Sequence, residues 1–332
     1  MAAERGFADA DRLAGVVKAA FGAGRRAMAA DRLPNGSKKG VYRLTLDDGG
    51  TAVVYVWNAA EDYWTGTLPD GADDRADPFA HASGLDLFRA AVERLSGVGV
   101  ACPRLIWADT SGELYPGDVA VVEDVSGGTL ESLLERDAAA AAPVMARLAE
   151  SLNAMHGYQA SDFGGVAFVD GGGRSREGSC EQAVLDRALA ETAEIAGRDQ
   201  RAAARREELA DKLRTLAGRV RPRAAFSVVH GELGPDHVLV DRRGAPVLID
   251  IEGLMYFDVE WEHVFVRLRF GRHYEPLRRD GLDEDRLRLY QLAMHVDLVA
   301  GPLRIADGDH PERAWFLEIA EYHLERALAY RV

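Results

Sequence analysis

The residues with the clearest chemical potential lie in two neighbouring segments, HGELGPDHVLVD at residues 230–241 and PVLIDIE at residues 246–252. The Leu-Gly-Pro turn is expected to bring Glu232 near His237, and a hairpin return would carry Asp250 back towards both. A carboxylate, an imidazole and a second carboxylate that converge in this way could serve as a general base and as metal ligands. The pattern therefore predicts a site for acid–base or metal-assisted chemistry.

The same residues also allow a purely structural interpretation. A histidine that opens a turn often holds backbone carbonyl groups, and this interpretation is favoured for His230. His237 could cap the turn in the same manner. Asp250 differs from both, because a carboxylate that follows the apolar run Val-Leu-Ile must leave a buried strand and find a partner. Asp250 is therefore the residue of this group that most strongly indicates function.

The first part of the chain is predicted to be a small antiparallel sheet with one inserted helix. Two segments rich in β-branched and aromatic residues, GVYRLTL and TAVVYVW, are separated by Asp-Asp-Gly-Gly, which suits a hairpin turn. The predicted elements are one or two short helices within residues 5–31, strands at 40–46 and 51–57, a polar loop at 58–80, a helix at 85–95, and strands at 104–108 and 119–123.

The rest of the chain is predicted to be mainly helical, with short β-type runs within residues 226–250. Thr129 is a plausible N-cap for the first of these helices. The predicted helices span residues 129–136, 138–156, 180–196, 199–219, 258–270, 283–300 and 311–330. The fold class is therefore α+β, with a β-rich N-terminal lobe at residues 1–122, a short hinge at 123–128 and a helical C-terminal lobe at 129–332.

Length, composition and charge narrow the class of protein. The 332 residues are 47% hydrophobic and 28% charged, an ordinary globular balance. The net charge of −14 would repel a phosphate backbone, so no nucleic-acid partner is expected. No apolar stretch approaches the roughly 20 residues that cross a bilayer, which predicts a soluble, cytoplasmic protein without a membrane partner. Cys102 and Cys180 cannot form a disulfide framework or a four-thiolate zinc site.

The two chemical segments resemble the catalytic segment of the aminoglycoside phosphotransferase and choline kinase group, a branch of the protein-kinase-like fold. The usual form in that group is HGDLxxxN, followed by a hydrophobic strand and I-D-W/F-E. The residues that fit this form are His230, Gly231, Leu233, Pro235, Leu239, Val240, Asp241, Ile249, Asp250 and Glu252. The resemblance implies a two-lobed kinase-like fold with a nucleotide between the lobes. It also implies transfer of the γ-phosphoryl group of ATP or GTP to a hydroxyl of a small molecule.

Roles for the catalytic segment follow from the resemblance. Glu232 stands at the position of the group's catalytic aspartate and would orient or deprotonate the acceptor hydroxyl. His237 stands at the position of a metal-binding asparagine, where it would be a second metal ligand or a phosphate donor, although magnesium prefers oxygen ligands. Asp250 is retained and would hold the divalent ion, Mg²⁺ or Mn²⁺. Glu232 is thus the expected catalytic residue, and His237 and Asp250 form the expected metal site.

The segment GSKKGVYRL at residues 36–44 is similar to the nucleotide loop of the same group. Ser37, Lys38 and Lys39 are therefore expected near the phosphates of the nucleotide. The group has an ATP-anchoring lysine on the following strand, but this strand contains no lysine and Tyr55 stands at that position. The two loop lysines could supply the missing charge, or they could be exposed turn lysines, and the sequence favours neither.

The segment VAVVEDVSGGTL at residues 119–130 is similar to the group's hinge. This implies that backbone groups of Glu123 and Val125 meet the nucleotide base. In the group, carboxylates of the helical lobe bind the acceptor, and Glu260 and Glu262 are the expected equivalents, although a solvated helix face would look the same. The acceptor would be antibiotic-like, as in antibiotic resistance, or a metabolite, and it could be cationic.

Two alternatives stay open. Because the lysine, aspartate and asparagine of the motif are replaced, the chain could be a pseudokinase that keeps a ligand-binding cleft but transfers nothing. His230, Glu232 and His237 could instead be the two histidines and one carboxylate of a metal oxygenase. The second alternative is weaker, because such sites normally draw one histidine from a distant strand.

Overall fold

The computed structural model describes residues 5–34, 36–69 and 71–332, which form two compact units. The first, called the sheet unit here, comprises the described residues of Met1–Gly66 with Ala82–Val144 and Asp236–Glu252. The second, the helical unit, comprises the described residues of Thr67–His81 with Met145–Pro235 and Gly253–Val332. Each unit is thus assembled from segments that lie far apart in the sequence.

The sheet unit is built on a five-stranded antiparallel sheet with the strand order β1-β2-β3-β5-β4. The alternation of large apolar residues with polar ones in β2 follows the two-residue repeat of a strand with one buried face. The strands are β1 (Ala27–Arg32), β2 (Gly40–Leu46), β3 (Thr51–Trp57), β4 (Leu105–Asp109) and β5 (Asp118–Glu123).

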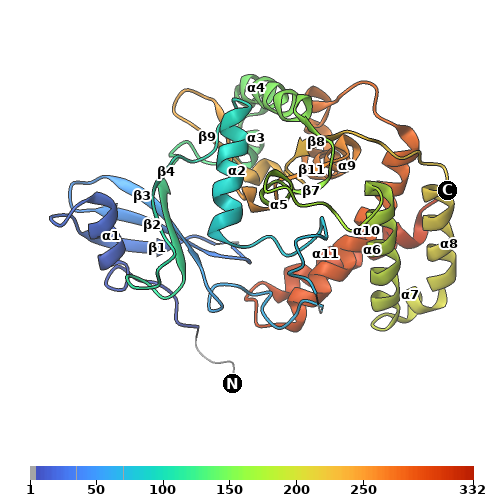
Figure 1. Ribbon diagram of the computed structural model, residues 1–332, viewed down its shortest axis with the longest axis horizontal. Helices are drawn as coiled ribbons and strands as arrows, with labels where there is room; N and C mark the ends of the chain where they lie inside the picture. Colours follow the sequence, from blue (N-terminus) through green and yellow to red (C-terminus); the bar gives the residue numbers. More distant parts are fainter. Residues whose placement is uncertain (1–4, 35, 70) are drawn as a thin grey trace. The chain divides into compact units, whose positions relative to one another are not determined.

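Helices cover both faces of this sheet. Helix α1 (Ala14–Phe21) buries Val16 and Val17 in a core that includes Val54 and Val56 of β3. The alternate residues of β3 point to the other face, where the Tyr55 ring lies 5.4 Å from the Phe88 ring of α2 (Leu85–Gly97). Helices α1 and α2 therefore lie on opposite sides of the sheet, and β3 is its buried centre (Figure 1).

A small hairpin and the start of the helical segment complete the sheet unit. Strands β9 (Val238–Val240) and β10 (Pro246–Leu248) form an antiparallel pair, which a 3₁₀ turn (Pro235–His237) precedes and another (Ile251–Gly253) follows. Helix α3 (Leu130–Arg136) begins at Thr129, whose hydroxyl accepts a hydrogen bond from the backbone of Ser132 at 3.2 Å. Helix α4 (Ala138–Gly157) follows directly.

The helical unit is centred on α10, which packs against α6, α8, α9 and α11. This unit also contains a four-stranded sheet with the order β6-β8-β11-β7. The elements are β6 (Gln159–Ala160), β7 (Gly164–Gly165), α5 (Val166–Asp170), α6 (Cys180–Ala196), α7 (Gln200–Ala204), α8 (Arg206–Ala217), β8 (Phe226–Val229), β11 (Met255–Phe257), α9 (Val259–Phe270), two 3₁₀ turns (Gly271–His273 and Glu275–Leu277), α10 (Glu284–Asp307) and α11 (Arg313–Ala329).

The predicted α+β class is confirmed, and most predicted elements are present within a few residues. Helix α1 confirms the prediction of a short helix within residues 5–31, but the end of that range is a strand, because Ala27–Arg32 pairs with β2 and this tertiary pairing overrides the helical preference of alanine. The predicted helix at 199–219 is broken at Arg205 into α7 and α8. The short strands β6, β7 and β11 and helix α5 were not predicted, because each is too brief for a periodic pattern.

The two units divide the chain differently from the predicted lobes. Residues 67–81 group with the helical unit, whereas α3, the start of α4 and the β9–β10 hairpin group with the sheet unit. The boundaries at residues 122 and 128 stay a prediction about which parts of the chain bind the nucleotide and the acceptor.

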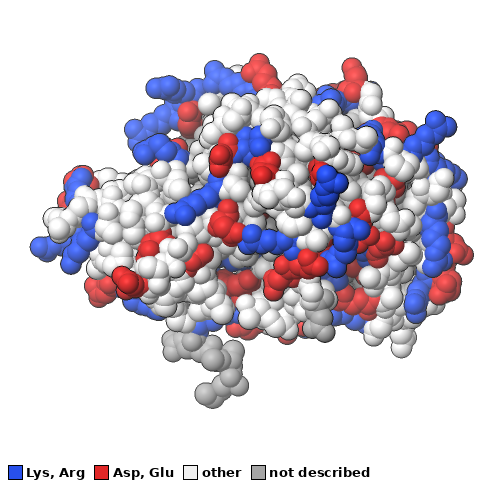
Figure 2. All heavy atoms as spheres, viewed as in Figure 1, with Lys and Arg blue, Asp and Glu red and all other residues white. Residues whose placement is uncertain are grey.

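Basic and acidic side chains lie close together on the face of the molecule that Figure 2 shows. Ion pairs of the helical unit include Arg205 with Glu208 at 2.6 Å and Lys212 with Glu208 at 2.7 Å. Among the residues that the structure describes, no helix has the length and apolar character needed to cross a membrane.

Candidate active site

The β9–β10 hairpin brings Asp250 next to His237. The backbone N–H of Ile249 donates to the carbonyl oxygen of His237 at 3.0 Å, which fixes the start of the hairpin beside its end. His237 Nε2 then lies 3.9 Å from Asp250 Oδ2. The predicted return of Asp250 towards His237 is therefore present, and both residues belong to the sheet unit.

Asp250 has an unusual backbone conformation. Its φ of 59° is the one positive value at a non-glycine position among the residues that the structure describes. Aspartate is one of the few residues that enters the left-handed region at modest cost, and such a conformation persists when the surroundings determine it. The conformation turns the Asp250 carboxylate out of the line of β10 and towards Lys39.

Lys39 holds two carboxylates at once. Its ammonium Nζ lies 2.7 Å from Asp250 Oδ1 and 2.7 Å from Glu252 Oε1, and the lysine is only 7% exposed. Burial lowers the pKa of Lys39, but the charges of Asp250 and Glu252 outweigh this effect and hold the pKa above its usual value. In turn, burial raises the pKa of Asp250, but Lys39 and His237 outweigh this effect and hold it well below its usual value.

The loop that carries Lys39 is tied down along its length. The Ser37 hydroxyl accepts a hydrogen bond from Trp64 Nε1 at 3.2 Å, and the Lys38 carbonyl accepts one from the Ser83 hydroxyl at 2.9 Å. Gly40 follows, and a side chain there would overlap Glu61 and the Tyr42 ring. The loop is therefore anchored on both sides of Lys39.

The aromatic ring of Tyr55 faces the Lys39 ammonium group. Lys39 Nζ is 5.4 Å from the centroid of the Tyr55 ring, within the range of a cation–π contact. Tyr55 is buried in the centre of β3, and burial raises the pKa of its hydroxyl. Lys39 thus reaches the position on β3 at which the sequence resemblance implies a lysine, but it does so from the preceding loop.

The carboxylates of this cluster could hold a cation, but the position between them is occupied by Lys39. The third side chain, His237, offers an imidazole nitrogen where Mg²⁺ prefers oxygen. Within the described part of the chain, no group of three or more His, Cys, Asp and Glu side chains is placed to hold a metal ion. The residues present therefore do not fit Mg²⁺ alongside the ammonium, and the metal oxygenase alternative gains no support.

The hinge residues lie at the end of β5. The backbone N–H of Glu123 donates to the carbonyl of Arg104 at 3.0 Å, and the Glu123 carboxylate accepts from the Arg104 N–H at 3.0 Å. Val125 follows two residues later and is half-buried. These contacts hold the backbone of Glu123 in place. Contact of Glu123 and Val125 with a nucleotide base stays a prediction.

Glu232 belongs to the helical unit, on the loop that follows β8. It is exposed, whereas the neighbouring His230 is buried. The backbone N–H of His230 donates to Glu262 Oε2 at 2.5 Å, and burial raises the pKa of the Glu262 carboxyl to about 7. Gly231, with φ of 86°, forms the bend between His230 and Glu232. Glu262 thus anchors the backbone of the catalytic loop.

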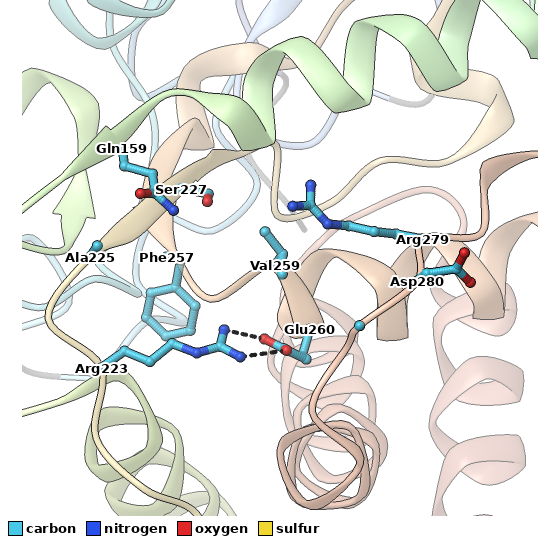
Figure 3. Close-up of a pocket in the computed structure, with 10 residues that line it drawn as sticks. Gln159, Arg223, Ala225, Ser227, Phe257, Val259, Glu260, Arg279 and Asp280 are labelled. Atoms are coloured by element: carbon cyan, nitrogen blue, oxygen red, sulfur yellow. Dashed lines mark hydrogen bonds and ion pairs between the residues drawn. The ribbon is translucent and has the colours of Figure 1, made fainter.

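Glu260 also has a structural partner. Arg223 donates two hydrogen bonds to its carboxylate, both at 2.7 Å (Figure 3). The N–H of Asp283 donates a third at 2.8 Å. Both Glu260 and Glu262 are fully buried. Both carboxylates thus have partners within the protein, and their contact with an acceptor stays a prediction. A cavity of about 210 Å³ adjoins the Arg223–Glu260 pair within the helical unit.

Several contacts of these side chains are not predictable from the sequence. Glu252 matches the family motif, but nothing in the sequence indicates its ion pair with Lys39. The buried partners of Glu260 and Glu262 are also not predictable, because charged residues alternate with apolar ones in α9 just as they do in a helix with one solvated face. The apolar segment MYFDV, which directly precedes Glu260, is the feature of the sequence that indicates burial of the start of α9.

The β-rich sheet unit with its catalytic hairpin, together with the helical unit, defines a protein-kinase-like fold. Over residues 31–297 the chain matches the model of the phosphotransferase enzyme family, APH. The chain belongs to this family. A search among curated proteins gave no significant match.

Solved structures of similar fold agree with this assignment. A thermostable mutant of aminoglycoside phosphotransferase APH(4)-Ia with ADP and hygromycin B is 18% identical, with 94% of this chain and 98% of that chain covered and a TM-score of 0.60. Spectinomycin phosphotransferase APH(9)-Ia with ADP and spectinomycin is 13% identical, with 96% and 94% covered and a TM-score of 0.61. Choline kinase LicA from Streptococcus pneumoniae is 13% identical, with 96% and 99% covered and a TM-score of 0.59.

Proposed function

We propose that the protein transfers the γ-phosphoryl group of a nucleoside triphosphate, ATP or GTP, to a hydroxyl group of a small molecule. Family membership supports a small-molecule phosphotransferase in general terms. For this chain, the observation that carries the proposal is the 2.7 Å ion pair between Lys39 of the glycine-containing loop and Asp250 at the end of the catalytic hairpin. It joins a phosphate-binding charge to the carboxylate that the family motif retains.

The proposed reaction is a direct displacement. The hydroxyl oxygen of the acceptor forms a bond to the γ-phosphorus, while the bond from that phosphorus to the bridging oxygen of the β-phosphate breaks. The nucleoside diphosphate leaves with the electron pair of that bond. Glu232 orients the acceptor hydroxyl and accepts its proton. Since phosphoryl transfer depends mainly on position and charge neutralisation, few other groups are needed.

The nucleotide is proposed to bind the sheet unit. The Lys39 ammonium neutralises phosphate charge, and the backbone N–H groups of its loop add hydrogen bonds. A divalent ion has no step in this proposal, because Lys39 occupies the position between the carboxylates. The residues that we propose to contact the nucleotide are Ser37, Lys38, Lys39, Tyr55, Glu123 and Val125.

The acceptor class is proposed from the fold and from the neighbours. The solved structures named above contain hygromycin B or spectinomycin, or belong to a choline kinase. An antibiotic-like molecule or an amino alcohol metabolite with a free hydroxyl is therefore the class to test first.

A screen for transfer tests the proposal. Aminoglycosides, spectinomycin, choline and other amino alcohols would each be incubated with ATP or GTP, and consumption of the nucleotide would be measured together with the mass of the acceptor. We expect one acceptor to gain the mass of one phosphoryl group per nucleotide consumed. Nucleotide binding without transfer to any acceptor would contradict the proposal.

A pseudokinase that acts as a ligand-binding module is the second candidate. It is favoured by Glu232, which replaces the family aspartate. The two candidates differ in turnover, and they also differ in the effect of restoring an aspartate at position 232.

A further inference from the structure

The Lys39 ammonium lies where two carboxylates would otherwise share a cation. We infer that the Lys39 ammonium group occupies the cation position between Asp250 and Glu252 and thereby excludes divalent metal ions from it. A neutral side chain at position 39 would then open a divalent-metal site between these carboxylates. The inference concerns the sheet unit alone, because all three residues belong to it.

The geometry of the three groups supports exclusion. One carboxylate oxygen of Asp250 and one of Glu252 lie at the same distance, 2.7 Å, from the ammonium, so both point to one position. Glu252 and Lys39 are both buried, each 7% exposed, which leaves little water to screen the charges. A divalent ion cannot enter this position unless the ammonium leaves both carboxylates.

The ammonium is also held by its own segment. On its N-terminal side, the Ser37 hydroxyl accepts a hydrogen bond from Trp64 Nε1 and the Lys38 carbonyl accepts one from the Ser83 hydroxyl. A side chain at Gly36 would overlap the Lys39 carbonyl, so the loop is folded closely on itself. Displacement of Lys39 would therefore break its buried ion pair with Glu252 and its partly exposed ion pair with Asp250, and we expect weak binding of metal by the natural protein.

One consequence rests on the proposed function. If nucleotide phosphates bind at this loop, Lys39 contacts them directly, and the natural protein binds the nucleotide in the absence of divalent metal. The inference about metal exclusion does not need this step, since it can be tested with neither nucleotide nor acceptor.

Binding of Mn²⁺ alone tests the inference. The loss of the electron paramagnetic resonance signal of free Mn²⁺ would be measured on titration with the natural protein, with Lys39→Met, and with Lys39→Met combined with Asp250→Asn. We expect the single variant to bind Mn²⁺ at least about tenfold more tightly than the natural protein, because a unit positive charge beside two carboxylates is removed. The added Asp250→Asn change should abolish the gain.

The matched control is Lys212→Met, which removes a half-buried lysine that also lies 2.7 Å from a carboxylate, that of the exposed Glu208. This variant should bind Mn²⁺ no more tightly than the natural protein. The inference is overturned if Lys39→Met gains no affinity, or if Lys212→Met gains as much.

A second comparison avoids the neutral residue at position 39 in case that variant does not fold. The natural protein and Asp250→Asn should bind Mn²⁺ equally weakly, because Lys39 already occupies the carboxylate. Tight Mn²⁺ binding by the natural protein that is lost in Asp250→Asn would overturn the inference. Failure of the phosphotransfer screen would leave both metal measurements unaffected, so the two ideas can fail separately.

Discussion

Tyr55 stands on the central strand β3 where the family motif leads one to expect a lysine, and Lys39 reaches the face of its ring from the neighbouring loop. Under the proposed function, Lys39 supplies from this loop the positive charge that the family motif places on the strand. Lys39 forms ion pairs with Asp250 and Glu252, both at 2.7 Å, and it donates a hydrogen bond to Asp250.

The position of Lys39 in the loop predicts how the change Lys39→Met affects nucleotide binding. We expect the affinity for ATP to fall by about tenfold or more without divalent metal, because a charge-assisted contact to phosphate is lost. The affinity for adenosine should be unchanged, since it has no phosphate. Calorimetric titration of both ligands in EDTA measures the two effects. Equal affinity of the variant and the natural protein for ATP would mean that Lys39 has only a structural role.

Gly127 shows how elements of the sheet unit meet at the hinge. The N–H of Val240 in β9 donates to the carbonyl of Gly128 at 2.9 Å, and Thr129 forms an isolated bridge with Leu239. A Cβ at Gly127 would overlap the carbonyl oxygen of Val240. The backbone of the predicted hinge therefore packs directly on the β9–β10 hairpin, and glycine is required at this contact.

We accordingly expect Gly127→Ala to lower the free energy of unfolding by about 2 kcal/mol or more, because the hairpin must shift to relieve the overlap. Urea unfolding followed by circular dichroism measures this change. The control is Gly97→Ala at the end of α2, where no atom lies within 4 Å of the added methyl group. An equal effect at both glycines would show that the hinge contact is not specific.

The elements of the sheet unit were predictable to different degrees for physical reasons. The β2–β3 hairpin carries both a strand pattern and a turn sequence, and its predicted limits are confirmed. β1 has an alanine-rich sequence and becomes a strand only through its pairing with β2. The approach of Asp250 to His237 follows from the hairpin, but the ion pair of Lys39 with Glu252 joins residues more than 200 positions apart. No local pattern encodes such a contact.

Burial of neutral histidines affects the stability of the whole molecule. His156 and His263 pack in the helical unit with ring centroids 5.4 Å apart, and both are almost fully buried. Burial lowers their pKa values to about 3 and about 4. In the unfolded chain histidine titrates near pH 6.5. Below that pH the unfolded chain therefore takes up more protons than the folded one, and stability is lost as the pH falls.

This linkage predicts that His156→Phe makes the protein less sensitive to acid. Between pH 7 and pH 5 the variant should lose less unfolding free energy than the natural protein, by about 2 kcal/mol, because one of the protons taken up on unfolding is removed. Urea unfolding at pH 5, 6 and 7 measures the slope. His273→Phe, at a half-exposed position, is the control and should keep the natural slope. A variant slope equal to that of the natural protein would contradict the explanation.

The identity of the acid at position 232 tests the proposed activity most directly. Glutamate reaches about one bond further than aspartate, and an error near 1 Å in position can cost about a hundredfold in rate. Turnover with the acceptor found by screening would be compared for the natural protein, Glu232→Asp and Glu232→Gln, together with nucleotide affinity. We expect both variants to lose most of their turnover while nucleotide affinity stays unchanged. Activity that is created or greatly raised by Glu232→Asp would instead identify the natural protein as a disabled kinase and contradict the proposed function.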